Sequence, residues 1–180
     1  MNFEIQKKTL AAVIRQELDA LIVLWPSDEN ADVQSNDLIA TLVRGAIQHG
    51  DFVPKSGAVL SLYAHPGIKA RYLVVACIAQ GSPSQVRTAM HAAWGAIKAA
   101  RIKRVGVHAA MDFHENVLTF AASSLADASY SYTSTLSKPK PRTLKQVVFS
   151  AAMVTVAHRS ALAQAQALVS GIEVAKEWAN

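Results

Sequence analysis

Six short apolar runs occur along the chain, and each is bounded by turn-forming or charged residues. Residues with β-branched side chains are common in them, which favours strands over helices. The runs are mostly continuous and do not alternate with polar residues, as is typical of strands covered on both faces of a sheet. The predicted strands are residues 3–5, 20–25, 58–63, 71–78, 104–108 and 146–151.

Between these runs, apolar residues recur at the spacing of an amphipathic helix. The predicted helices cover residues 9–18, 37–48, 82–100, 115–130 and 156–177. The last of them carries one apolar stripe, formed by Leu162, Ala165, Val169, Ile172 and Ala175. A helix of this kind is suited to dock against a neighbouring surface.

Local signals mark where two of these helices begin and end. Asn36 or Ser35 is the expected N-cap of the helix over 37–48, and Gly50 is its expected stop. The string Ser-Pro-Ser-Gln at 82–85 combines an N-cap serine, a proline in the first turn and a glutamine three residues after the cap. It predicts a helix start at this point.

Strands and helices alternate through the whole chain, which predicts a three-layer α/β fold with a mixed sheet between helices. The polar segment 131–143 contains two prolines and is expected to be an exposed loop. Elements of the same kind lie on both sides of this loop, so we expect residues 1–180 to form a single domain.

Composition agrees with a folded, non-membrane protein. Of 180 residues, 51% are apolar and 17% are charged, which excludes the signature of disorder. No apolar run approaches the roughly 20 residues that span a bilayer, and the start resembles no signal peptide, so a cytoplasmic location is expected. The single cysteine, Cys77, excludes an internal disulfide and is expected to be a buried, inert thiol.

The net charge of +5 is unevenly distributed, because the first 51 residues carry eight acids and only four bases. Two basic clusters follow: Lys98, Arg101, Lys103 and Arg104, and then Lys138, Lys140, Arg142 and Lys145. Such clusters attract phosphates and are therefore candidate nucleic-acid-binding residues. The ordinary interpretation is a solvated surface, since no aromatic residues are interleaved for base stacking.

A search for catalytic motifs finds no dinucleotide fingerprint, phosphate-binding loop, zinc-protease helix or nucleophile elbow. The best grouping of metal-ligand types is His108, Asp112, His114 and Glu115. A structural role is favoured there, with His108 packed at a strand end and an acid near the start of the next helix.

The remaining histidines show no acid or nucleophile beside them in the sequence. His49 is expected to interact with a helix end, His65 to belong to a turn, and His91 and His158 to stand alone in helices. The three tryptophans, Trp25, Trp94 and Trp178, are expected to cover core or interface area.

Four segments resemble the N-terminal domain of the leucyl aminopeptidase (cytosol aminopeptidase) family: residues 1–5 (MNFEI), 56–62 (SGAVLSL), 69–75 (KARYLVV) and 171–180 (GIEVAKEWAN). The last is similar to the family's interdomain helix, although Trp178 replaces a smaller aliphatic residue. The family's metal-binding strings, such as Asn-Thr-Asp-Ala-Glu-Gly-Arg, do not occur in this sequence, so no catalytic or metal residue is carried over.

This resemblance implies a macro-domain-like fold and a parent enzyme that removes N-terminal residues from peptides with zinc or manganese. It further implies a homohexamer and a catalytic C-terminal domain that is absent from this chain. The chain by itself is then expected to be non-catalytic, without a cofactor of its own, and to serve assembly and possibly regulation.

Two alternatives remain open at this stage. A stand-alone module for nucleotides or ADP-ribose is compatible with a macro-like fold, although only Gly81 is available in the loops after Ile78 and His108. DNA binding through the two basic clusters is the other alternative, and some bacterial members of the resembled family bind DNA.

Overall fold

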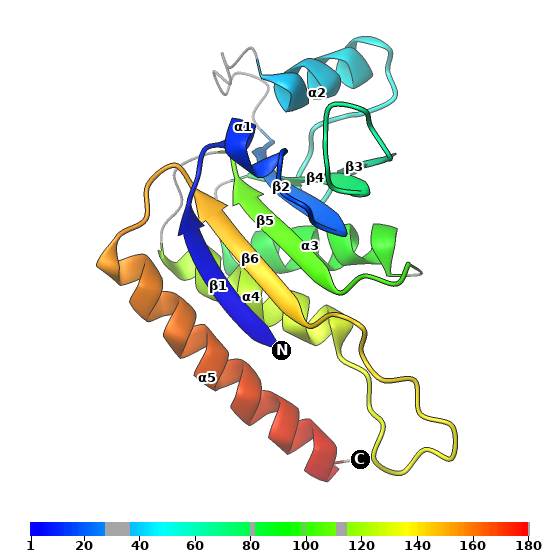
Figure 1. Ribbon diagram of the computed structural model, residues 1–180, viewed down its shortest axis with the longest axis vertical. Helices are drawn as coiled ribbons and strands as arrows, with labels where there is room; N and C mark the ends of the chain where they lie inside the picture. Colours follow the sequence, from blue (N-terminus) through cyan, green and yellow to red (C-terminus); the bar gives the residue numbers. More distant parts are fainter. Residues whose placement is uncertain (28–36, 80–81, 99, 111–114, 180) are drawn as a thin grey trace.

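The computed structural model describes residues 1–27, 37–79, 82–98, 100–110 and 115–179, and within them one six-stranded sheet forms the centre (Figure 1). The strand order is β1-β6-β5-β2-β4-β3. Only β3 runs antiparallel to its neighbour, so the sheet is mixed, as predicted. The strands are β1 (Asn2–Lys7), β2 (Ala20–Pro26), β3 (Val59–Tyr63), β4 (Tyr72–Ile78), β5 (Arg104–Ala109) and β6 (Gln146–Ala151).

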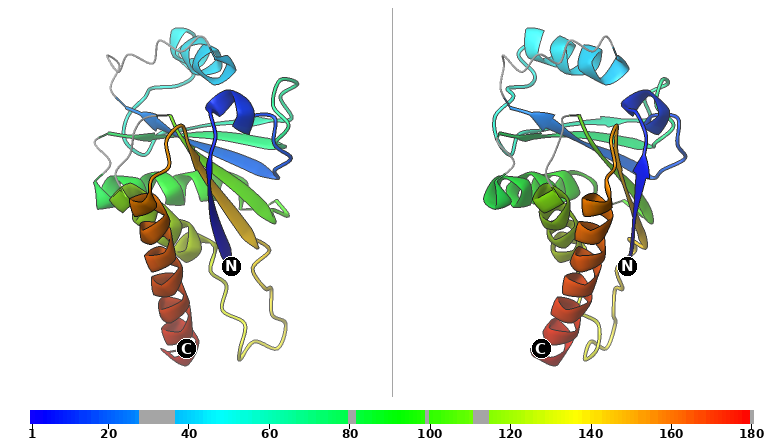
Figure 2. Two further views of the ribbon diagram at one scale, coloured as in Figure 1. Left: turned by 60° about the vertical axis from the view of Figure 1, so that its left-hand side comes forward. Right: turned by 90° about the vertical axis from the view of Figure 1, so that its left-hand side faces the viewer.

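Helices cover both faces of the sheet and complete the predicted three-layer α/β fold (Figure 2). One face packs against α3, α4 and α5, and the other against α1 and α2. Their bounds are α1 (Leu10–Val13), α2 (Leu38–Gln48), α3 (Pro83–Ile97), α4 (Glu115–Ser129) and α5 (Val156–Ala179).

The continuous apolar runs are buried because they are covered on both faces. All seven residues of β2 are buried, and so are six of the seven in β4. Their side chains alternate between the core under α3–α5 and the smaller core under α1 and α2. Trp25 and Trp94 lie in these cores, as expected.

The helix starts confirm one expectation and correct another. At α3, Ser82 is the N-cap, Pro83 is the first helical residue, and the Ser82 amide donates to Gln85 Oε1 at 3.3 Å. The N-cap of α2 is Asp37, not Asn36 or Ser35, because its carboxylate accepts a hydrogen bond from the Ala40 amide at 2.8 Å. Ser35 and Asn36 lie outside the described residues.

Two further boundaries depend on local chemistry. Gly50 follows α2 with φ +78, a left-handed conformation that a glycine adopts without strain, so the predicted stop is confirmed. The first helix is shorter than predicted and ends at Val13. Ile14 is the C-cap and packs against the core, but the three residues after it, Arg15 to Glu17, are polar and offer no apolar face that would hold another turn against the sheet.

Helix α5 extends past the sheet, so only part of its apolar stripe is buried (Figure 1). Leu162, Ala165 and Val169 are buried as predicted. Ile172 is 41% exposed and Ala175 is exposed, because the last turns lie beyond the sheet. The predicted exposed loop is confirmed, since residues 131–143 form no helix or strand. In the described part of the chain, no helix has the length and apolar character needed to cross a membrane.

Candidate functional site

The histidine and acid grouping at 108–115 is only partly visible. Asp112 and His114 lie outside the described residues, and Glu115 stands in the first turn of α4, where a negative charge favours the helix dipole. Among the described residues, no three side chains of the His, Cys, Asp or Glu type are placed to hold a metal ion.

His108 has the buried structural role that the sequence favoured. The ring is 3% exposed, and its Nδ1 lies 3.0 Å from the hydroxyl of Ser150 on the neighbouring strand β6. Burial lowers the pKa of His108 to about 4, against a weaker opposing effect of the Asp37 charge. The imidazole is consequently neutral near pH 7.

Three other histidines make short-range contacts. His49 Nδ1 lies 2.7 Å from the Gly45 carbonyl oxygen at the end of α2, as expected for a histidine at a helix end. His65 Nδ1 accepts from the Gly67 amide at 3.1 Å within a turn, and His158 Nδ1 accepts from the Thr155 amide at 3.1 Å. These contacts define the local backbone and do not form a catalytic group.

His91 corrects an expectation, because it does not stand alone. Its Nε2 lies 3.4 Å from Asp127 Oδ2, across the gap between α3 and α4. The two residues are 36 positions apart in the sequence. No spacing rule connects them, and only the packing of the two helices brings them together.

The two predicted basic clusters meet at the amino end of the sheet. The Lys145 amide donates to the Lys103 carbonyl oxygen at 2.8 Å, so the end of one cluster lies beside the end of the other. The exposed members are Lys98, Arg101, Lys103, Lys138, Lys140 and Lys145, and Arg104 is half-buried. We call Arg101, Lys103, Arg104 and Lys145 the basic rim.

The carboxylate of Asp19 lies beside the basic rim and offsets part of its positive charge. One carboxylate oxygen of Asp19 accepts from the Lys103 and Arg104 amides at 2.8 and 2.9 Å, and the other lies 3.7 Å from the Arg71 guanidinium. The amides are fixed backbone donors, so Asp19 mainly organises the start of β5.

Arg142 is separated from the basic rim by its own partner. Its guanidinium binds both carboxylate oxygens of Glu173 on α5, at 2.5 and 3.2 Å. Both side chains are partly buried, with exposed fractions of 16% and 26%. A paired, forked contact of this kind anchors the loop to α5 and leaves Arg142 less suited to a phosphate than the exposed lysines.

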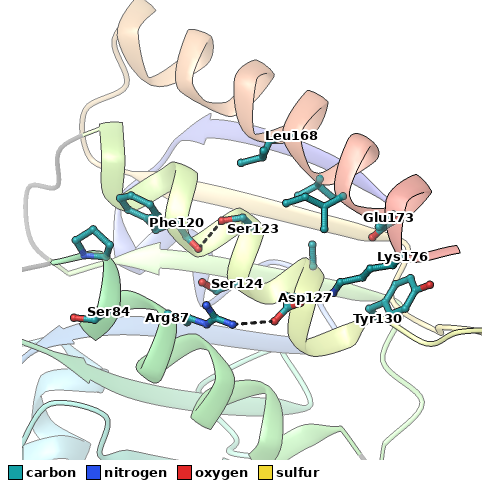
Figure 3. A pocket seen from close by; sticks show the side chains of 14 residues that line it. Ser84, Arg87, Phe120, Ser123, Ser124, Asp127, Tyr130, Leu168, Glu173 and Lys176 are labelled. Carbon is teal, nitrogen blue, oxygen red and sulfur yellow. Dashed lines mark hydrogen bonds and ion pairs between the residues drawn. The ribbon is translucent and has the colours of Figure 1, made fainter. Parts of the chain in front are cut away.

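A groove of about 530 Å³ crosses α4 between α3 and α5 (Figure 3). Apolar side chains form much of its surface, and charged groups gather at one end. It is lined by Pro83, Ser84, Arg87, Phe120, Ser123, Ser124, Ala126, Asp127, Tyr130, Leu168, Val169, Ile172, Glu173 and Lys176.

Asp127 is the centre of the charged end of this groove. Lys176 Nζ lies 2.5 Å from its Oδ1, and the Arg87 guanidinium lies 3.6 Å from its Oδ2 (Figure 3). The pKa of Asp127 is lowered, chiefly by the hydrogen bond from Lys176 and further by the charges of Lys176, His91 and Arg87, although burial opposes this. These contacts join α3, α4 and α5 in one network.

Glu177 makes the next contact along α5. The Tyr130 hydroxyl donates to its Oε1 at 2.7 Å, and the Ser134 hydroxyl donates to its Oε2. These bonds, the one from Ser134 first, lower the pKa of Glu177, while the bond to Glu177 raises the pKa of Tyr130 to about 12. Together with Arg142–Glu173 and Lys176–Asp127, they hold the last turns of α5; we call these contacts the polar clasp.

Apolar side chains on the same turns remain uncovered. Val174 is 57% exposed and Trp178 is 88% exposed, whereas Leu168, at 49%, lies further back on the helix and lines the groove. The last turns of α5 are thus held by polar contacts and present an apolar surface outward. The sequence suggested the docking potential of this helix, but the groove and its charged centre depend on residues from three helices that no local pattern relates.

The glycine relevant to the nucleotide-binding alternative, Gly81, lies outside the described residues. The loop after β5 is likewise outside them from position 111 to 114. The described residues therefore add no support for that alternative.

Comparison with known proteins gives a consistent result. The family model described as "Cytosol aminopeptidase family, N-terminal domain" matches residues 23–139. A "Probable cytosol aminopeptidase" of a Polaromonas species is 39% identical over the whole chain, and one of Albidiferax ferrireducens is 35% identical. The chain belongs to the cytosol aminopeptidase family and corresponds to its N-terminal domain, as the resemblance in sequence indicated.

The chain spans 35% and 37% of the length of these two relatives. Among solved structures, a mutant of tomato leucine aminopeptidase aligns over 96% of this chain and 36% of its own, with a TM-score of 0.70 and 17% identity. The "Bottromycin maturation enzyme BotP" covers 89% of this chain and 32% of its own, with a TM-score of 0.61 and 14% identity. At these identities the two structures establish a shared fold.

Proposed function

We propose that this chain is the non-catalytic N-terminal domain of a cytoplasmic, metal-dependent leucyl aminopeptidase, and that it serves assembly and regulation of the enzyme. The observation that carries the proposal is a pair of uncovered apolar side chains on the last turns of α5, Val174 and Trp178, which are 57% and 88% exposed. The relatives are nearly three times as long as this chain, so most of their length lies outside the part that it matches.

The proposed division of labour follows from the chemistry that the described residues offer. Zinc or manganese chemistry needs several convergent ligands, and the described residues provide no such group. We therefore assign the metal and peptide cleavage to the remaining part of the longer protein. The contribution of this chain is a docking surface at the end of α5, whose direction the polar clasp stabilises.

The test is binding in trans to the remaining part of the Polaromonas relative, produced without its matching N-terminal third. We expect this chain to bind it, and Trp178→Asp to weaken the binding about tenfold or more, because a charge would enter an apolar contact. Val156→Asp is the matched control, since Val156 is 84% exposed at the opposite end of the same helix.

Two results would contradict the proposal. One is equal loss of binding in the Trp178 and Val156 variants. The other is cleavage of leucine p-nitroanilide by the 180-residue chain alone in the presence of Zn²⁺ or Mn²⁺.

DNA binding is the second candidate, and one observation favours it: the Lys103–Lys145 backbone contact joins the two basic clusters in the basic rim. Duplex DNA should bind with an affinity that falls steeply between 50 and 200 mM salt, by about tenfold for each few phosphates contacted. Fluorescence anisotropy with a labelled duplex measures this. Lys103→Glu with Lys145→Glu should abolish binding, while Lys7→Glu with Lys8→Glu, at the far end of β1, should not.

A further inference from the structure

The two edge strands of the sheet, β1 and β3, differ in how far they are covered by other parts of the chain. At the β1 edge, α5 lies alongside the strand (Figure 1), and the side chain of Gln166 bonds its main chain. Gln166 Oε1 accepts from the Phe3 amide and its Nε2 donates to the Met1 carbonyl oxygen, both at 3.2 Å. This edge is covered and its outward groups are partly satisfied, so it offers little room for another strand.

The opposite edge of the sheet is β3, and two hydrogen bonds at its ends fix which of its main-chain groups face β4. The Cys77 amide donates to the Ala58 carbonyl oxygen, and the Ala64 amide donates to the Arg71 carbonyl oxygen. In an antiparallel pair, the main-chain N–H and C=O groups of successive residues point alternately toward and away from the partner strand. The main-chain groups of the even-numbered residues therefore point toward β4, and those of Val59, Ser61 and Tyr63 point away from it. The main-chain groups of these three residues have no hydrogen-bond partner in the part of the chain that the structure describes.

The sequence of β3, Val-Leu-Ser-Leu-Tyr, lacks features that usually block an edge strand. It contains no proline and no charged residue, and the bulge-like turn at Gly57 comes before the strand begins. Ser61 is exposed and Tyr63 is 66% exposed, so the outer half of the strand is accessible. An accessible, uncharged edge of this kind is a template for another strand.

We propose that β3 pairs antiparallel with β3 of a second copy of this chain, with the two-fold axis at Ser61. This register places Val59 opposite Tyr63 of the second copy and Ser61 opposite Ser61 of the second copy. The three outward residues of each strand then exchange main-chain hydrogen bonds. The proposal deepens the assembly role proposed above, because it names one interface by which copies associate.

The side chains fit this register on both faces. On the α2 side, Leu60 and Leu62 form one row with their counterparts, continuing the apolar layer in which both are already packed. On the other side, an aromatic residue meets a β-branched one, a favourable cross-strand pair. No like charges meet, and each strand is already ordered by β4, so association orders less chain than binding of a flexible peptide would.

The first experiment is disulfide trapping with the 180-residue chain. Residues opposed in an antiparallel hydrogen-bonded pair lie about 5.5 Å apart between Cα atoms, within the range that a disulfide spans. We expect Ser61→Cys to form a covalent dimer under mild oxidation. Ser170→Cys is the matched control, an exposed serine on α5, and should react far more slowly; equal rates for the two variants would overturn the proposal.

The second experiment is sedimentation velocity over a concentration series. Ser61→Lys places two cations opposite one another at the two-fold axis and should raise the dimer dissociation constant about tenfold or more, with partial recovery at high salt. Ser61→Thr keeps the amide and adds no charge, so it should dimerise like the unmodified chain. Circular dichroism of both variants checks that the fold is intact.

Three outcomes of this series would overturn the proposed interface. They are a chain that stays monomeric up to about 1 mM, a dimer that Ser61→Lys leaves intact, and a monomer that instead binds a labelled Val-Leu-Ser-Leu-Tyr peptide. A dimer unaffected by Ser61→Lys would leave the proposed function standing. Failure of the Trp178 experiment would affect that function and not the β3 interface.

Discussion

At the residue scale, burial decides the chemistry of the two groups that look most reactive in the sequence. Cys77 is fully buried in β4, and burial raises the pKa of its thiol to about 11, so it is an inert core residue, as expected. His108 is likewise buried, and its pKa is lowered to about 4. The sequence could suggest these roles because both residues lie in apolar runs, but the bond from His108 to Ser150 required the pairing of β5 with β6.

His108 predicts a pH dependence of stability. Its pKa is 6.5 when unperturbed and about 4 in the fold, so between these values the unfolded chain binds a proton that the folded chain does not. The contribution of the neutral, buried His108 to the free energy of unfolding is fully present above about pH 6.5. It is lost as the pH falls toward 4, by up to about 3 kcal/mol. Urea unfolding at pH 7, 5.5 and 4 should show this loss, and His108→Gln should reduce it. An identical pH dependence in the variant would contradict the prediction.

At the element scale, α5 shows how one helix can have two modes of attachment. Its first half packs on the sheet through Leu162, Ala165 and Val169, and these positions follow from periodicity. Its last turns depend on the polar clasp, whose partners come from α4 and from the segment 130–142 that follows it. No sequence pattern relates Arg142 to Glu173 or Asp127 to Lys176, since these pairs are 31 and 49 residues apart.

The Arg142–Glu173 contact should be measurable as a coupling free energy. In a double-mutant cycle with Arg142→Gln and Glu173→Gln, we expect about 1 kcal/mol of coupling, because both groups are partly buried and the contact is two-pronged. Urea unfolding provides the four values. Arg87→Gln is the control, because Arg87 is 68% exposed at 3.6 Å from Asp127 and should change stability by less than about 0.5 kcal/mol. Coupling indistinguishable from zero would show that the Arg142–Glu173 contact does not stabilise the attachment of α5.

At the scale of the whole molecule, the first and last parts of the chain are joined at one edge of the sheet. Strand β1 pairs with β6 and is flanked by α5, so residues 1–7 lie beside residues 146–170. The long-range bonds of Gln166 to Met1 and Phe3 complete this edge. The result is asymmetric, with a covered β1 edge and an accessible β3 edge, and this asymmetry supports the interface proposed at β3.

Gln166 should therefore matter more than an ordinary half-buried helix residue. Gln166→Leu keeps a good helix former but leaves the Phe3 amide without its acceptor, and we expect a loss of about 1–2 kcal/mol in the free energy of unfolding. Gln166→Glu retains the acceptor and should lose less. Hydrogen exchange at the Phe3 amide gives a local check: faster exchange is expected in the leucine variant, and unchanged protection would contradict the role assigned to Gln166.

What the sequence determined by itself is the set of elements and their order. Continuous β-branched runs predicted all six described strands, because strands covered on both faces tolerate few polar residues. Helical periodicity predicted α2 to α5, and the Ser82 and Gly50 signals marked two of their ends. The first helix was predicted too long, over 9–18 where α1 covers Leu10–Val13. The Asp37 cap was missed, because propensity alone does not show which neighbouring polar residue turns toward the helix amides.

What only the tertiary structure decided is which distant residues meet. Strand order, the groove over α4, the Asp127 network and the meeting of the two basic clusters all depend on pairing and packing across the whole chain. The physical reason is that the hydrophobic effect is non-directional. It favours covering an apolar face but does not determine which segment covers it. Hydrogen-bond register and side-chain packing make that choice, and they exist only in the assembled fold.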